Sequence, residues 1–173
     1  ITIAVTGVLQ EEYSSPKVNQ VRVVGAQGYP VQATTSGVAN GGGATWLSPS
    51  SGTGALFQPN GQGWVLENFF LNNSATAAGC VKLVNAGDPP SSNCSESFIL
   101  RGCRLTGTDD GVAATDLPNH VLIDRCTFFG FSGASDLAIS SATGAGTGTL
   151  LDWVIQDCDF YGNTGHITAP FSG

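Results

Sequence analysis

The chain has 173 residues and is acidic, with 13 Asp and Glu against 6 Lys and Arg and a formal net charge of −7. This balance disfavours a nucleic-acid-binding groove, which needs a basic surface, and no apolar run is long enough to span a bilayer as a helix. Charged residues are 11% and hydrophobic residues 41% of the chain, so we expect a folded domain with no nucleic-acid partner and no membrane insertion.

At the amino-terminal end we expect residues 1–20 to form a segment or cap, and residues 21–173 to form the main domain. Residues 19–28 look like a weak copy of a pattern that recurs later. Its three apolar positions would be Val21, Val23 and Ala26. A long excursion or an unrecognised strand then separates this stretch from the next copy. Because the chain has no Met and starts with Ile1, we expect it to be a fragment of a longer protein.

A ten-residue pattern then recurs four times with variable spacing. Its copies cover residues 64–73, 98–107, 121–130 and 153–162. A self-similar segment that returns every few tens of residues is typical of a solenoid, in which each repeat adds one structural unit. Unequal spacers between constant copies indicate a constant core with variable loops.

Within each copy, apolar residues occupy the first, third, sixth and eighth positions, which we call columns one to four. The columns contain Trp64, Phe98, Val121 and Trp153; Leu66, Leu100, Ile123 and Ile155; Phe69, Cys103, Cys126 and Cys158; and Leu71, Leu105, Phe128 and Phe160. Columns one and two, and columns three and four, have the period of a strand with one buried face. The step of three between columns two and three predicts a bend. The bend residues are Asn68, Gly102, Arg125 and Asp157.

A further short apolar stretch precedes each copy, and a similar one follows the last. These stretches cover residues 55–57, 80–84, 112–114, 137–139 and 167–169. Together with the two strands inside each copy they give three short strands per coil, and strands of successive coils would pair at about 4.8 Å. The sequence therefore predicts an all-β fold, a single-stranded parallel β-helix of about five coils.

The outward positions of the repeat carry charges that can pair. Arg101 and Asp124 occupy equivalent outward positions in successive copies, as do Glu67 and Gln156 in the first and last copies. We expect Arg101 and Asp124 to form an ion pair across adjacent coils. Arg125 is a bend residue and should be exposed to solvent.

Cysteines occupy two kinds of position. Three of them share column three: Cys103, Cys126 and Cys158. We interpret this ladder as buried thiols that act as small apolar side chains. Three sulfurs in a line are not the tetrahedral cage of a zinc site, and neither His120 nor His166 has ligand spacing to them, so we expect no metal and no cofactor. Cys80 and Cys94 flank a Pro-rich loop and could close it as a disulfide.

The phrases Val-Leu-Ile-Asp-Arg-Cys-Thr-Phe-Phe-Gly at 121–130 and Trp-Val-Ile-Gln-Asp-Cys-Asp-Phe-Tyr-Gly at 153–162 resemble coils of the pectate-lyase-like superfamily. Residues 41–49, followed by 62–68, are similar to bacteriophage virion proteins of this group. The resemblance covers roughly residues 20–170 and implies a right-handed parallel β-helix. Members include polysaccharide lyases, hydrolases, phage tailspikes and non-catalytic spikes, so it implies the fold more strongly than an activity.

Enzymes of this superfamily use calcium held by acidic residues, or paired carboxylates. The weak candidates here are Asp109, Asp110 and Asp116, because Asp116 follows the first two by one short strand. Asp110 precedes Gly111, and Asp-Gly is a common turn pair, so turn formation is the competing interpretation. No Lys or Arg matches a lyase base motif, and no catalytic residue is carried over. Trp46 is a weak candidate for stacking on a sugar, with core packing as the alternative.

The expected function is that of a structural or host-interaction protein of a bacteriophage virion, such as a β-helical spike, fibre or capsid decoration. The resemblance implies assembly in the host cytoplasm, a homotrimer in the extracellular particle, and contacts with other virion proteins and with host-surface glycan. The first alternative is a tailspike depolymerase, a polysaccharide lyase or glycoside hydrolase acting on that glycan. The second alternative is a bacterial surface adhesin.

Overall fold

The structure is a computed structural model, and it describes residues 1–26, 44–74, 78–84, 95–115, 118–133, 136–142 and 152–168. These residues contain eighteen short strands, β1–β18, and no helix. Accordingly, no helix in the described ranges is long and apolar enough to cross a bilayer.

The strands form three parallel sheets, and each sheet takes every third strand of the chain. The first sheet contains β1 (Thr2–Val5), β4 (Arg22–Gly25), β7 (Val65–Glu67), β10 (Ile99–Arg101), β13 (Leu122–Asp124) and β16 (Val154–Gln156). The second contains β2 (Val8–Gln10), β5 (Ala44–Leu47), β8 (Phe69–Asn73), β11 (Arg104–Gly107), β14 (Thr127–Phe129) and β17 (Asp159–Tyr161). The third contains β3 (Tyr13–Ser14), β6 (Phe57–Gln58), β9 (Val81–Val84), β12 (Val112–Thr115), β15 (Leu137–Ala142) and β18 (Gly165–Thr168).

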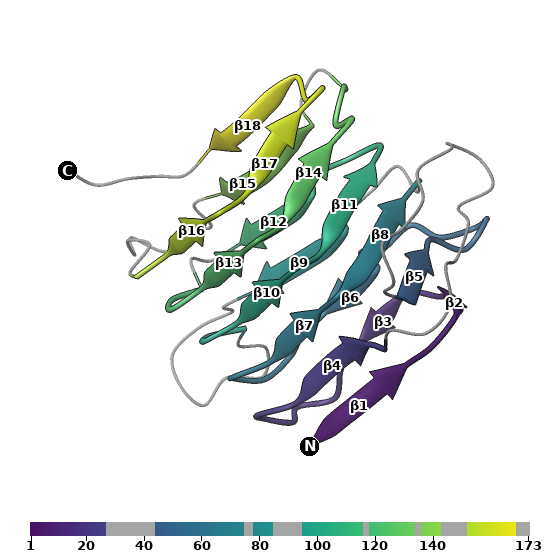
Figure 1. Cartoon of the computed structure of the whole chain (residues 1–173), viewed down its shortest axis with the longest axis vertical. Coiled ribbons are helices and arrows are strands. Elements are labelled where there is room, and N and C mark those ends of the chain that lie inside the picture. The colour runs from purple at the N-terminus through teal and green to yellow at the C-terminus, as the bar shows by residue number, and fades with distance from the viewer. Residues whose placement is uncertain are drawn as a thin grey trace.

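Three consecutive strands therefore make one coil, and the chain forms a right-handed parallel β-helix of six stacked coils. Figure 1 shows the stack rising from β1–β3 at the N-terminus to β16–β18 near the C-terminus. The predicted fold class and the three strands per coil are confirmed, with six coils rather than about five. The first coil comes from residues 2–14, within the segment expected as a cap, because β1, β2 and β3 pair with β4, β5 and β6.

The predicted columns are confirmed by the strand register. In column two, Leu66 pairs with Leu100, which pairs with Ile123, and all three side chains are fully buried. Leu71 and Leu105 pair in the same way in column four. Similar side chains stack on one another, so successive coils build one continuous hydrophobic core inside the β-helix.

The predicted bends are also confirmed. Asn68, Gly102, Arg125 and Asp157 have φ values of 61°, 58°, 52° and 53°. This left-handed conformation turns the chain from the first sheet into the second at one residue, so that columns two and three face the same interior. A second set of positive-φ residues lies just before column one. Its members are Gln20, Gly63, Ser97, His120 and Asp152.

The weak copy near residue 21 is confirmed for columns one and two only. Val21 and Val23 are buried, and Val23 pairs with Leu66. The residue that pairs with Phe69 in column three is Ala44 rather than Ala26. The prediction for Ala26 is wrong because the strand that follows the bend in the second coil, β5, begins only at Ala44. The unrecognised strand is β5, whereas β6 overlaps the stretch 55–57 that the sequence predicted.

Candidate functional site

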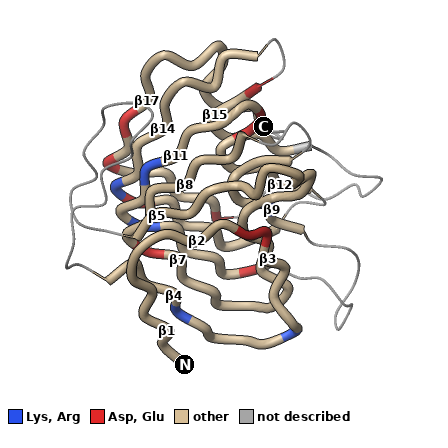
Figure 2. The backbone as a smooth tube through the Cα atoms, turned by 90° about the vertical axis from the view of Figure 1, so that its right-hand side faces the viewer, with Lys and Arg blue, Asp and Glu red and all other residues tan. Residues whose placement is uncertain are grey.

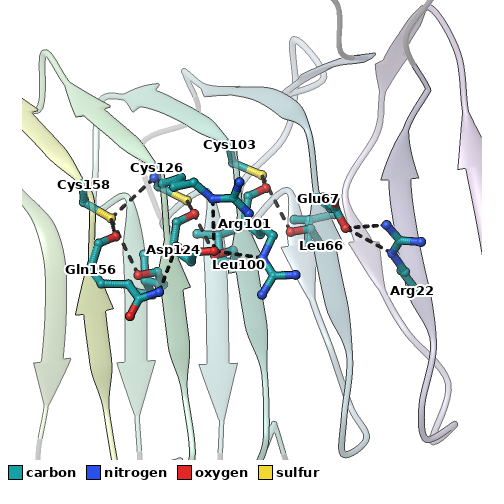
Figure 3. A network of polar contacts seen from close by, with 12 residues as sticks. Arg22, Leu66, Glu67, Leu100, Arg101, Cys103, Asp124, Cys126, Gln156 and Cys158 are labelled. Atoms are coloured by element: carbon teal, nitrogen blue, oxygen red, sulfur yellow. Dashed lines mark hydrogen bonds and ion pairs between the residues drawn. The ribbon is translucent and has the colours of Figure 1, made fainter.

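The most extensive polar network lies on the outer surface at the corner between the first and second sheets (Figure 3). It begins with one outward position of the first sheet, which carries a charged or amide side chain in four successive coils. These residues are Glu67, Arg101, Asp124 and Gln156, and the strand register places them side by side. The adjoining bend adds Arg125. We call Arg101, Asp124, Arg125 and Gln156 the corner network.

Asp124 is the centre of the corner network. Its oxygen Oδ2 accepts hydrogen bonds from Arg101 Nε at 2.9 Å and from Arg125 Nε at 3.2 Å, and its oxygen Oδ1 accepts one from Gln156 Nε2 at 3.1 Å. The hydrogen bond from Gln156, followed by those from the two arginines, lowers the pKa of the Asp124 carboxyl. Asp124 is only 4% exposed, and its lowered pKa keeps the carboxylate ionised at neutral pH.

The expected ion pair between Arg101 and Asp124 is thus confirmed. Glu67, the other register neighbour of Arg101, pairs instead with Arg22 in the preceding coil. Arg22 binds Oε2 of Glu67 through Nε at 3.1 Å and through Nη2 at 2.8 Å. Both nitrogens converge on one oxygen, so the pair is charge-assisted without being the two-oxygen bidentate form.

The cysteine ladder lies directly behind this corner. Cys103 and Cys126 are buried, as predicted, and Cys158 in the last coil is partly buried. Each thiol donates to the carbonyl two residues earlier, at 3.4, 3.4 and 3.1 Å respectively. Contact with the neighbouring thiol, followed by burial, raises the pKa of Cys158. A thiol held in its protonated form is a poor nucleophile and a poor metal ligand, and the described residues contain no cluster suited to a metal ion.

The carboxyl candidates near residue 110 have a different setting. Asp110 accepts a hydrogen bond from the Leu137 backbone N–H at 2.7 Å and a short one from the Ser140 hydroxyl. It therefore ties the turn of the fourth coil to β15 of the fifth. Burial raises the pKa of this carboxyl. Asp109 is half-buried beside it, and Asp116 lies outside the described residues, so the proposed three-carboxylate cluster remains a prediction.

Trp46 occupies column four, between Leu9 and Leu71 in the register of the second sheet. It is 3% exposed, and its ring contacts those of Phe57 and Phe69 at centroid distances of 5.7 Å each. Its Nε1 donates to the Glu11 carbonyl at 2.8 Å. Trp46 is therefore a core residue, and its ring faces are covered by neighbours instead of being open to a sugar.

Cys80 is a buried free thiol that donates to the Thr106 carbonyl at 3.2 Å. Burial raises the pKa of this thiol to about 12. Cys94 lies outside the described residues, so the disulfide between the two cysteines remains a prediction.

Two outer surfaces were not anticipated from the sequence. On the outside of the second sheet, the rings of Phe129 and Tyr161 stack with their centroids 5.4 Å apart. Phe70 also stacks on Phe129, with a centroid distance of 6.3 Å. Arg104 Cζ lies 5.3 Å from the centre of the Phe129 ring. Tyr161 is 50% exposed. We call Phe129, Tyr161 and Arg104 the aromatic face. The sequence feature that could have predicted this face is the aromatic residue just after column four, Phe129 and Tyr161, in two successive copies.

On the first sheet, the second position of every copy is apolar. These residues are Val65, Ile99, Leu122 and Val154, and they pair in register across four coils. We call them the apolar stripe. They alternate with the buried columns and therefore lie on the outside of the sheet, where all four are partly or fully exposed. A line of apolar side chains on a solvent-facing sheet is typical of a surface that contacts another molecule.

Comparisons with known proteins do not identify the chain. No family model matches it, and no curated protein and no solved structure is significantly similar to it.

Proposed function

We propose that the chain is a structural, host-interacting module of a bacteriophage virion, such as a β-helical spike, fibre or capsid decoration. The observation that carries this proposal is the apolar stripe, which follows the long axis of the stacked coils beside charged side chains that pair within the chain. Such a surface suits lateral packing in an assembly. The resemblance of residues 41–49 and 62–68 to bacteriophage virion proteins supplies the link to phage particles.

The assembly that best fits this surface is a homotrimer. If three copies pack around an axis parallel to the solenoid, each level of the stripe meets the same level in its neighbours. Arg22 already pairs with Glu67, and Asp124 with Arg101 and Arg125. Arg101, Asp124 and Arg125 lie at the corner with the second sheet, beside the stripe, so packing through the stripe leaves the two arginine side chains accessible to solvent. Other virion proteins would contact the remaining faces.

The association state tests this proposal. We expect the purified chain to sediment as a trimer in analytical ultracentrifugation, and Leu122→Lys to produce a monomer because it places a charge in the middle of the stripe. Ala113→Lys, on the outer face of the third sheet, is the matched control and should remain trimeric. A wild-type chain that stays monomeric at high concentration would contradict the trimer. Mass spectrometry of purified phage particles tests the virion location separately.

The aromatic face supports a second role, the binding of host-surface glycan, because aromatic rings and adjacent polar groups are common partners of sugars. Incubation with host-surface polysaccharide separates this role from the depolymerase alternative. Binding without release of new reducing ends or unsaturated products supports a recognition module. Product release would instead support an enzyme, with Asp109 and Asp110 as the first residues to substitute. A secreted chain found on bacterial cells rather than in particles would favour the adhesin alternative.

A further inference from the structure

The corner network contains more positive charge than its single carboxylate neutralises. Arg101 and Arg125 both use Nε to reach the same oxygen of Asp124, and Figure 3 shows the terminal nitrogens of Arg101 directed away from this carboxylate. An arginine bound through Nε retains four N–H groups on its terminal nitrogens. Among the described residues, these terminal nitrogens have no hydrogen-bond or ion-pair partner in either side chain.

The two guanidinium groups are also accessible and held in place. The Arg125 side chain is 62% exposed and that of Arg101 35%, whereas that of Asp124 is 6% exposed. Arg101 ends a central strand of the first sheet, and Arg125 is held at a bend by the Gln156 carbonyl, which accepts its backbone N–H at 3.1 Å. Such preorganised donors lose little conformational entropy when they bind a ligand.

The surrounding charges define where an anion would sit. Arg104, just past the bend of the fourth coil, lies over the ring of Phe129, so the charges that meet at this corner are Arg101 and Arg125 against Asp124. Asp157 and Asp159 follow in the sixth coil, and the described residues show no ion pair of either carboxylate with Arg101 or Arg125. Figure 2 shows basic and acidic segments on the same flank near β11, β14 and β17.

We propose that Arg101 and Arg125 form a binding site for one tetrahedral oxyanion, sulfate or phosphate, either free or as an ester on a larger ligand. Guanidinium groups match the oxygens of such anions in pairs, with charge-assisted hydrogen bonds. Asp124 is a positioning residue that keeps the two groups together. The formal charge of −7 for the whole chain disfavours a long polyanion, because the remaining surface repels it, and so favours a single anionic group.

Isothermal titration calorimetry at low ionic strength tests the site, with inorganic phosphate, inorganic sulfate and glucose 1-phosphate as probes. We expect saturable binding with one site per chain. Arg125→Gln should raise the Kd about tenfold, the usual consequence of losing a charge-assisted hydrogen bond. Arg22→Gln is the matched control, because it removes the same charge from a side chain that is 49% exposed but has no second arginine beside it. Its Kd should stay within about twofold of wild type.

The outcomes are distinct. Tighter binding of glucose 1-phosphate than of inorganic phosphate identifies an ester as the ligand, whereas equal affinities identify the free ion. Equal weakening by Arg125→Gln and Arg22→Gln would overturn the proposal, because it would show only a general charge effect, and so would the lack of saturable binding of all three probes. Asp157→Asn provides a test that leaves both arginines intact. It should strengthen binding by removing a nearby carboxylate, and weaker binding would count against the site.

Discussion

At the scale of single residues, two aspartates show how position in the coil decides the chemistry of a side chain. Asp124 lies at an outward position where three donors converge, and its carboxyl pKa is lowered. Asp110 lies in a turn whose burial outweighs its two hydrogen bonds, and its pKa is raised. The charged form is favoured in one place and disfavoured in the other, so the two residues should link pH to stability with opposite signs.

We predict that Asp124→Asn lowers the melting temperature at pH 7 and that its difference from wild type shrinks on acidification. A lowered pKa means that the stabilising effect of Asp124 is present above the unfolded-state value of about 3.9 and is lost as pH falls through the folded-state value. Asp110→Asn should behave oppositely. Because the pKa of Asp110 is raised in the folded state, the wild type loses stability as the pH rises from the unfolded-state pKa through the folded-state pKa. Asp110→Asn has no such loss, so its melting temperature should rise relative to that of the wild type over this pH interval. Thermal unfolding by circular dichroism from pH 2 to pH 7 measures both, and identical pH profiles would refute the assignment.

At the scale of secondary-structure elements, the unit of stability is the column and not the isolated strand. Strands of two to six residues have little stability alone. Each buried side chain is instead held by its equivalents in the coils on either side. Phe128 illustrates this, because it is fully buried in column four and stacks on Phe160 at 5.1 Å with nearly parallel rings.

Substitution of Phe128 should therefore be among the most destabilising changes in the chain. We expect Phe128→Ala to lower the free energy of unfolding by about 3–5 kcal/mol, through lost burial and the cavity left between coils. Phe160→Ala is the control in the same column. Phe160 is only partly buried, so its loss should cost clearly less. Urea unfolding followed by tryptophan fluorescence gives both free energies of unfolding. Equal losses for the two variants would show that burial between two neighbouring coils does not determine the cost.

At the scale of the whole molecule, the six coils form a one-dimensional stack in which each strand pairs only with its equivalents in adjacent coils. The stability of such an array is close to a sum of coil terms and interface terms between neighbours. Coils two to five have two neighbours each. In the first and last coils, Ile3 and Val154 are exposed, and one edge of every strand lacks a parallel partner among the described residues.

Hydrogen exchange measured by mass spectrometry should report this gradient. We expect the amides of β7–β15 to be protected longest, and those of β1–β3 and β16–β18 to exchange first, because local opening of an end coil breaks only one interface. The proposed trimer should retain the same order, because lateral packing adds no neighbour along the solenoid axis. Uniform protection along the chain would contradict the one-dimensional description.

The sequence predicted the part of the fold that depends on repetition. Columns one to four, the bends at Asn68 and Arg125, and the third strand of each coil were visible because stacking places the same kind of side chain at the same level in every coil. The ion pair of Arg101 with Asp124 followed from the same register. The strands of the first coil and β5 of the second were missed because strands such as β3, of two residues, have no pattern of their own.

Tertiary structure alone decided the place of Trp46 and most of the contacts on the outer surface. Trp46 is part of the core because β5 lies between β2 and β8, a pairing that its neighbours in the chain do not reveal. The convergence of Arg125 and Gln156 on Asp124, and of Arg104 on Phe129, involves residues up to 32 positions apart. The repeats predict the interior, because stacked coils pack well only when similar side chains occupy equivalent interior positions. The outer face has no such requirement, so its contacts arise only once the coils are stacked.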